Sequence, residues 1–287
     1  MLACPVYDTS NGSVTRIGTA TFVMAGIFLT AKHNFEAWQA RGTGAGRDYD
    51  IDQLPSGSGI AFSADVMQYA KFGRIVWHVE QVLMIPGYDI ALLVCSPANE
   101  AVLELVNKHG FPGTAIGFDL HAPLVGEKVT ALGFPGTGVD AASLEATPME
   151  DLVGSHGDVE ELYETRPGLI RAAAIQANNE VQPGMSGGPV LRDGQLICGL
   201  ISTAIEPSDD YGSYTTFISP LWQAFNTPFT TNLLSSEGKA RTLNLIEAAA
   251  EGYLVVEGTE HISSIDDSLA WNSVAADCAN CVRHMKA

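Results

Sequence analysis

The residues best suited to chemistry are one serine, one histidine and one aspartate that lie far apart in the sequence. Ser186 lies in the segment 183–189, PGMSGGP, which holds three glycines and two prolines. His33 follows one strand-like apolar segment, and Asp89 precedes another. A serine hydroxyl is a weak nucleophile near pH 7, so it needs a base such as imidazole, and a buried carboxylate then orients the ring. These three residue types predict nucleophilic catalysis by Ser186, with His33 as base and Asp89 as its partner.

The glycines beside Ser186 predict a second catalytic feature. Acyl transfer passes through a tetrahedral intermediate whose oxyanion is best stabilised by backbone N–H groups. Gly184 can turn its N–H inward at small steric cost, and the N–H of Ser186 can point to the same place. We therefore expect an oxyanion hole made by Gly184 and Ser186, in which each donor is worth about 3–4 kcal/mol of barrier.

Each of these residues also has an ordinary explanation. A histidine after a strand is usually a core or surface residue, and an aspartate before a strand is usually a turn residue. The glycine-flanked serine is harder to explain as a turn, because so irregular a backbone weakens any regular element. The prediction therefore depends on the three residues taken together.

The first two-thirds of the sequence consist of short strand-like segments separated by turns rich in glycine and proline. This pattern is typical of a β-sandwich or barrel, and the lack of alternating strand and helix units argues against a parallel doubly wound sheet. The segments are Thr15–Leu29, Ile60–Tyr69, Arg74–Ile85, Ile90–Cys95, Glu127–Phe134, Leu169–Ala177, Pro189–Leu191, Leu196–Ala204 and Tyr214–Ile218. Asn99–His109 has the spacing of a surface helix.

Two regions depart from this pattern. The acidic stretch at about 137–168 loses it and is interpreted as an insertion loop, with short helices over Met149–Val153 and Val159–Tyr163. From Leu233 onward the spacing becomes helical. We therefore expect one domain over residues 1–232 and a mostly helical C-terminal extension over residues 233–287.

Within this extension, helical spacing covers Lys239–Ala250 and Ser268–Lys286, and Gly252–Val256 is the one expected strand. About 55 residues are marginal for an independent domain, so the extension is expected to pack on the preceding domain.

Charge and composition exclude several classes of function. The 287 residues include 15 Lys and Arg against 33 Asp and Glu, a net charge of −18. Because such a chain repels phosphates and anionic lipids, we expect no nucleic-acid and no membrane partner. Residues 1–12 have no secretory pattern, and the five scattered cysteines do not suggest a disulfide framework, which favours a cytoplasmic location. Cys95 and Cys198 lie in apolar segments and are expected to be small core residues, and no cofactor is predicted.

The chain order histidine, aspartate, serine is that of chymotrypsin-like enzymes and differs from that of subtilisin and the α/β-hydrolases. The sequence resembles the trypsin/chymotrypsin-like serine peptidases, and within them the HtrA-type bacterial enzymes. The resemblance covers residues 12–225 and is carried by LTAKH (29–33), YDIALL (88–93), GEKVTALGFP (126–135), the nucleophile region 174–191 and TFISP (216–220).

This resemblance implies two six-stranded antiparallel β-barrels with the active site in the crevice between them. His33 and Asp89 would come from the first barrel, and Ser186 from the second. By the same analogy a strand pairs with the substrate backbone. Its residues would be Ile201, Ser202, Thr203 and Ala204.

Glu180 lies six residues before Ser186, where trypsin-like enzymes keep the acid that selects a basic substrate side chain. A buried Glu180 would favour arginine or lysine through a charge-assisted contact. The alternative is a solvent-facing loop residue, since HtrA-type enzymes shape this pocket differently.

The sequence also departs from the family. Met185 stands where the digestive enzymes have the aspartate that receives a newly cut N-terminus, so N-terminal trimming is not expected to activate this chain. The oxyanion loop is then either preformed or ordered by a partner, a ligand or an oligomer. HtrA-type enzymes commonly carry a PDZ domain, and the residues from Leu233 are too few and too helical for one.

Cys278, Cys281 and His284 form one further cluster. They could ligate Zn²⁺ together with His261 or Cys4, or take part in redox chemistry. However, steps of three residues also mark one buried face of a helix. Because only one CxxC is present, plain packing is favoured and no metal site is predicted.

Three functions follow from these observations. The leading prediction is a serine endopeptidase that cleaves protein or peptide substrates through an acyl-enzyme. The alternative is a catalytically silent peptidase fold that binds peptides or regulates. In a third interpretation the enzyme is latent, and a protein partner activates it through the acidic insertion or the extension.

Overall fold

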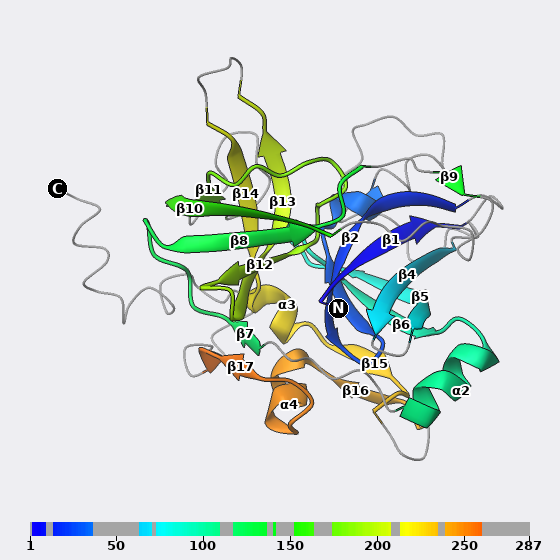
Figure 1. The fold of residues 1–287 in the computed structure, drawn as a ribbon. Helices are drawn as coiled ribbons and strands as arrows, with labels where there is room; N and C mark the ends of the chain where they lie inside the picture. The colour runs from blue at the N-terminus through cyan, green and yellow to red at the C-terminus, as the bar shows by residue number, and fades with distance from the viewer. Residues whose placement is uncertain are drawn as a thin grey trace.

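Strands dominate the molecule, as the sequence predicted (Figure 1). The computed structural model describes residues 2–9, 14–36, 63–70, 73–109, 117–136, 140–141, 152–163, 174–207, 213–234 and 239–259. Among these residues no helix is long and apolar enough to cross a bilayer.

Six antiparallel strands close into a first barrel in the order β1-β4-β5-β6-β3-β2, with β2 pairing back to β1. They are β1 (Ala3–Asp8), β2 (Val14–Met24), β3 (Ile27–Thr30), β4 (Ala64–Ala70), β5 (Gly73–Met84) and β6 (Ala91–Pro97). The short β9 (Asp140–Ala141) adds to β2. Phe28 is fully buried and contacts Phe22 and Trp77 edge-on, so the apolar core of this barrel includes a packed aromatic cluster.

A second barrel closes in the order β12-β8-β10-β11-β14-β13, with β13 pairing back to β12. Its strands are β8 (Lys128–Gly133), β10 (Val153–Tyr163), β11 (Ala174–Ala177), β12 (Pro189–Arg192), β13 (Leu196–Ile205) and β14 (Thr215–Pro220). Two short strands extend this sheet in parallel, β7 (Gly117–Asp119) beside β13 and β17 (Val256–Glu257) beside β7. The two six-stranded barrels that the resemblance implied are confirmed.

The prediction of a short helix at Val159–Tyr163 is wrong, because these residues end strand β10, which pairs with both β8 and β11. A bulge between Val159 and Glu161 breaks the alternation of this strand. As a result Val159 and Leu162, which are three residues apart, both pack in the barrel core, and this imitates helical spacing. The acidic region at about 137–168 therefore contains a barrel strand, and the predicted helix at Met149–Val153 lies mostly outside the described residues.

One predicted strand is a hairpin in the structure, and the one predicted surface helix is found. Thr15–Leu29 is a hairpin of β2 and β3 rather than one strand, and it turns at Gly26, whose φ of +70° favours glycine. The predicted helix at Asn99–His109 is confirmed as α2 (Glu100–His109). It begins there because the Asn99 side chain accepts a hydrogen bond from the Val102 N–H at 3.0 Å.

The extension is not mostly helical where it is described. Strand β16 (Arg241–Leu243) pairs with β15 (Phe229–Thr231), so the helix α4 (Leu245–Ala250) begins only after it. Asn244 caps α4 in a reciprocal capping box with Glu247. The predicted strand at Gly252–Val256 is wrong except for Val256, which begins β17 (Val256–Glu257), because residues 252–255 form a turn. The predicted helix at Ser268–Lys286 lies outside the described residues.

The extension packs on a core that both barrels share. One apolar cluster joins Leu29 and Leu92 of the first barrel, Phe118 and Leu200 on the side of the second, and Leu245 of α4. Figure 1 shows this segment in orange along the base of the molecule, below the helix α3 (Trp222–Asn226). The domain limits of 1–232 and 233–287 remain a prediction, although the β15–β16 pair spans that boundary.

We expect Leu245→Ala to lower the free energy of unfolding by about 2–5 kcal/mol, because it leaves a cavity where a fully buried side chain packs against both barrels. Urea denaturation measures this change. As a control, Leu103→Ala on α2 removes a side chain that is 40% exposed and should cost under about 0.5 kcal/mol. Equal costs for the two variants would contradict the shared core.

Candidate active site

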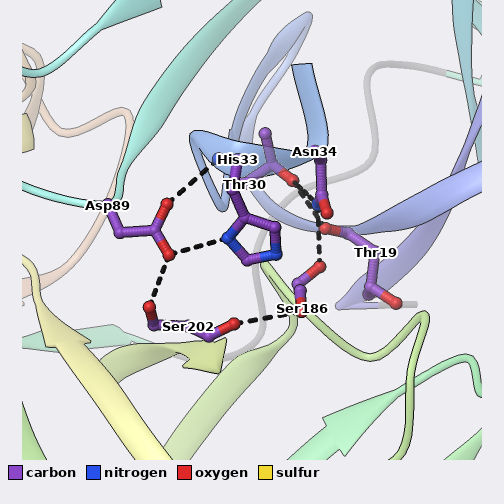
Figure 2. Close-up of polar contacts among 7 residues, drawn as sticks. All are labelled: Thr19, Thr30, His33, Asn34, Asp89, Ser186 and Ser202. Carbon is purple, nitrogen blue, oxygen red and sulfur yellow. Dashed lines mark hydrogen bonds and ion pairs between the residues drawn. The ribbon is translucent and has the colours of Figure 1, made fainter. Parts of the chain in front are cut away.

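His33 and Asp89 meet on the first barrel (Figure 2). His33 opens a helical turn over residues 33–36 that directly follows β3, and Asp89 lies in the turn before β6. The His33 Nδ1 lies 2.8 Å from Asp89 Oδ2, and the backbone N–H of His33 donates to Asp89 Oδ1 at 3.0 Å. Because a carboxylate only accepts, Nδ1 carries the proton and Nε2 is left as the basic nitrogen.

A tight turn places Asp89 against the histidine. The Ile85 N–H donates to the Ile90 carbonyl at 2.9 Å, which closes the turn across the ends of β5 and β6. Gly87 has a φ of +74° in this turn, a conformation that suits glycine. The carboxylate of Asp89 is 18% exposed and the imidazole of His33 is 41% exposed, so the pair is shielded on the carboxylate side and open on the other.

The pKa values of the two groups move apart. Burial lowers the pKa of His33, but the hydrogen bond and charge of Asp89, with the charge of Glu36, outweigh burial, so this pKa lies above its ordinary value of 6.5. Burial raises the pKa of Asp89, but the hydrogen bond and charge of His33 and a hydrogen bond from Ser202 hold it below 3.8. The carboxylate is therefore ionised near pH 7, and His33 gains a proton readily.

The loop around Ser186 packs so closely against its surroundings that two of its positions require glycine. Gly184 has a φ of +96° and Gly187 a φ of +87°. A Cβ on Gly184 would lie 2.5 Å from the Gly136 carbonyl oxygen, and one on Gly187 would lie 2.2 Å from that of Thr19. The glycines that the sequence singled out are therefore explained by backbone conformation and close approach.

Two N–H groups of this loop find no acceptor among the described residues, those of Gly184 and Ser186. Their neighbours do, since the Met185 N–H donates to Gln182 and the Gly188 N–H donates to Met185. Because an unpaired donor costs free energy unless water or a ligand satisfies it, these two donors on either side of Met185 are available to an acceptor such as a negative oxygen.

Ser186 lies with His33 and Asp89 in one cluster, and Ser202 links its parts (Figure 2). The Ser186 Oγ donates to the Ser202 carbonyl oxygen at 3.0 Å, and the Ser202 Oγ donates to Asp89 Oδ2. Within the described chain no hydrogen bond joins Ser186 Oγ to His33. A rotation of the serine side chain would be needed to form it, and such bonds are often unmade without substrate.

The first barrel holds the backbone of the nucleophile loop. The Thr19 hydroxyl donates to the Gly184 carbonyl at 2.8 Å, and the Thr19 N–H donates to the Ser186 carbonyl at 3.0 Å. The Thr21 hydroxyl donates to the Gly187 carbonyl at 3.0 Å. Sequence reasoning missed these contacts, because alternating threonines on β2 look like ordinary strand residues.

The expected substrate strand is the last part of β13. Ile201 and Ser202 are buried, Ala204 is half-buried and Thr203 is exposed. β14 pairs with one side of this segment, and β12 pairs only up to Leu200. Among the described strands none pairs with the other side of residues 203–205, so this edge is open to an added strand.

Glu180 is exposed, which agrees with the alternative that it is a solvent-facing loop residue. Its charge raises the pKa of the Tyr214 hydroxyl. Selection of a basic substrate side chain by Glu180 stays a prediction, and the exposure of Glu180 gives it no support.

Met185 is fully buried and packs in the second barrel with Val181 and Val190. Its backbone and side chain lie so close to Gly133 that a Cβ there would be 2.8 Å from Met185. An apolar side chain therefore anchors the nucleophile loop at the position where the resemblance to digestive enzymes would place an aspartate.

The described cysteines are core residues. Cys95 and Cys198 are 2% and 3% exposed, which confirms the prediction, and Cys4 is also buried. Burial raises the pKa of the Cys198 thiol to about 12, so it is unreactive near pH 7. The described residues contain no metal-binding group of three His, Cys, Asp or Glu, and Cys278, Cys281 and His284 lie outside them.

We expect Asp89→Asn to lower the pKa of His33, because burial would then act without the opposing charge. Titration of the His33 ring protons by NMR measures this change. In the unsubstituted protein the midpoint should lie above 6.5. A midpoint at or below 6.5, or no decrease in the variant, would contradict the pairing.

The same shifts fix the sign of the effect of pH on stability. The raised pKa of His33 stabilises the fold below pH 6.5, and this contribution is lost as the pH rises through the folded-state pKa. The lowered pKa of Asp89 stabilises the fold above pH 3.8, and this contribution is lost as the pH falls through the folded-state pKa. The pair therefore contributes most between pH 3.8 and pH 6.5, where both contributions are fully present.

Solved structures of several proteases resemble this chain, and no curated protein matches it. The Rv3671c protease of M. tuberculosis, in its inactive form, is 15% identical over 77% of this chain and 84% of its own, with a TM-score of 0.46. The MamO protease domain from Magnetospirillum magneticum is 15% identical over 77% of this chain and 92% of its own, with a TM-score of 0.47. The HtrA-type protease AlgW with tripeptide is 16% identical over 76% of this chain and 56% of its own, with a TM-score of 0.45.

Likeness at this level carries no argument about activity. A comparison with models of protein families is decisive. The model of the trypsin-like peptidase domain matches residues 18–200, well over half of the chain. The chain belongs to the trypsin-like peptidase domain family.

Proposed function

We propose that this protein is a serine endopeptidase that hydrolyses peptide bonds in protein substrates with Ser186, His33 and Asp89. Membership of a peptidase family implies protein substrates. One observation carries the proposal: Ser202 links Ser186 to the paired His33 and Asp89. Beside Ser186 are two backbone N–H groups that have no acceptor in the part of the chain that the structure describes.

In the proposed reaction the Ser186 hydroxyl leaves the Ser202 carbonyl and donates to His33 Nε2. Its oxygen attacks the substrate carbonyl while His33 takes the proton, and the N–H groups of Gly184 and Ser186 receive the oxyanion. Asp89 stabilises the imidazolium. His33 then gives its proton to the leaving amine, and water releases the acyl group by the same steps. Because His33 must begin neutral, activity should rise with pH through its raised pKa.

The oxyanion loop is proposed to be preformed. Gly184 already has a positive φ, Met185 is buried in the second barrel, and Thr19 holds the Gly184 carbonyl from the first. These contacts hold the loop without an N-terminal ammonium ion. They favour an enzyme that needs no N-terminal cleavage for activation.

The substrate is proposed to bind as an added strand along Ile201, Ser202, Thr203 and Ala204. The open edge of β13 at Thr203 and Ala204 supports this, since main-chain hydrogen bonds supply affinity without regard to sequence. The N–H and carbonyl of Ile201 already bond to the nucleophile loop, so they give it no support. Selection of arginine or lysine by Glu180 has the least support of the proposed contacts, because an exposed carboxylate is screened by water.

One observation favours the alternative of a catalytically silent peptide-binding module. The Ser186 hydroxyl is bonded to Ser202 rather than to His33. The same observation fits a latent enzyme that a protein partner activates. The cytoplasmic location and the lack of nucleic-acid and membrane partners stay as predictions from charge and composition.

We expect a fluorophosphonate probe to label the full-length protein and not its Ser186→Ala variant, because only an activated hydroxyl attacks phosphorus. Hydrolysis of a peptide found by library profiling should fall by about 10⁴-fold or more in this variant. Ser96→Ala, on β6, serves as the control. If the protein is a silent peptide-binding module, the unsubstituted protein will bind peptides but the probe will not label it.

N-methylation of a cleaved peptide should reduce kcat/KM by about tenfold or more at alternate residues and little at those between. This follows because every second amide of an added strand faces β13. Steady-state kinetics on a series of singly methylated peptides measures it. Uniform tolerance along the peptide would exclude strand addition.

A further inference from the structure

The residue after the proposed base reaches across to the nucleophile. Asn34 lies in the same helical turn as His33 and is 7% exposed. Its Nδ2 donates to the carbonyl oxygen of Ser186 at 3.0 Å and to the hydroxyl of Thr30 at 3.1 Å (Figure 2). Because the Ser186 carbonyl can only accept, the amide must present its nitrogen there, and its two protons serve both contacts.

These bonds belong to a closed circuit. The Thr30 hydroxyl donates to the Thr19 carbonyl at 2.7 Å, and the Thr19 N–H donates to the Ser186 carbonyl at 3.0 Å. Asn34 completes the circuit by bonding to both Thr30 and Ser186. The Ser186 carbonyl thus receives two donors, both from the first barrel.

Gly18 provides the space for this amide. A Cβ on Gly18 would lie 2.2 Å from the Nδ2 of Asn34 and 2.6 Å from its Cγ. Gly18 does not have a positive φ, so turn geometry does not explain the glycine. Its absent side chain is accounted for by the close approach of Asn34.

We propose that Asn34 is a positioning residue that fixes the Ser186 backbone relative to His33. This inference rests on the proposed peptidase function. One helical turn carries both the base and the donor that holds the carbonyl of the nucleophile, so the spacing between them is set locally. When the Ser186 hydroxyl rotates from Ser202 to His33, the circuit keeps the serine backbone and its N–H in place.

The contact is expected to matter more for rate than for stability. In Asn34→Ala the Ser186 carbonyl keeps the Thr19 N–H, and the Thr30 hydroxyl keeps the Thr19 carbonyl. No buried partner is therefore left without a bond, which limits the loss of stability. By contrast, a displacement of about 1 Å between reacting groups costs about 10²-fold in rate.

The test is saturation kinetics of fluorophosphonate labelling of the full-length protein, which separates the maximal labelling rate from the probe's apparent affinity. Asn34→Ala should lower the maximal rate by about 10- to 100-fold and leave the affinity within about twofold. Asn34→Asp keeps the shape but places an acceptor against the Ser186 carbonyl, so its loss should be at least as large.

Gly18→Ala tests the same contact from its other side, because the added methyl displaces the amide. It should reduce the maximal rate as Asn34→Ala does, and the double variant should be no slower than the worse single variant. Gln68→Ala is the matched control. The side-chain amide of Gln68 is buried in the first barrel and accepts a hydrogen bond from the indole N–H of Trp77 at 3.0 Å. Its loss should therefore lower Tm without changing the labelling rate.

The outcomes separate the two proposals. If the unsubstituted protein is labelled at Ser186 and Asn34→Ala is labelled within about twofold of its maximal rate, the positioning role is wrong and the peptidase function stands. Multiplicative losses in the double variant would also overturn it, since independent sites add in free energy. If the unsubstituted protein is not labelled, both proposals fail.

Discussion

The structure of the site depends on how the carbonyl groups of the nucleophile loop are satisfied. Segment 183–189 has too many glycines and prolines to form its own ladder, so its buried carbonyls need donors from elsewhere. The carbonyls of Gly184, Ser186 and Gly187 take theirs from β2 and from the turn after β3, on the other barrel. The need to satisfy these groups therefore aligns the two barrels where the reacting side chains meet. It also leaves the N–H groups of Gly184 and Ser186 free to bind a ligand.

The charge at the site depends on both barrels as well. A carboxylate as shielded as Asp89 is costly unless several donors satisfy it. The backbone and ring of His33 supply two from the first barrel, and Ser202 supplies another from the second. Ser202 also accepts the hydroxyl of Ser186, so one residue of β13 contacts both the acid and the nucleophile. Ser202 thus both helps to hold Asp89 ionised and connects the two barrels at the site.

Much of this arrangement is visible in the sequence, and the failures have physical causes. The strands with clear alternation or apolar runs were predicted, and so was the convergence of His33, Asp89 and Ser186. Val159–Tyr163 was misread because a bulge gives a strand the spacing of a helix. Residues 241–243 were misread because pairing with β15 overrides their local helical pattern. Thr19, Thr21 and Asn34 were missed because their partners lie more than a hundred residues away, and no local signal marks such contacts.

The most direct measurement is a crystal structure of the full-length protein with a peptide boronic acid, which mimics the tetrahedral intermediate. We expect a covalent bond between boron and the Ser186 Oγ. One boronate oxygen should lie about 2.7–3.1 Å from the N–H nitrogens of both Gly184 and Ser186, with the peptide beside β13. A boronate bound elsewhere, or bonded to Ser186 with its oxygens turned away from these two nitrogens, would contradict it.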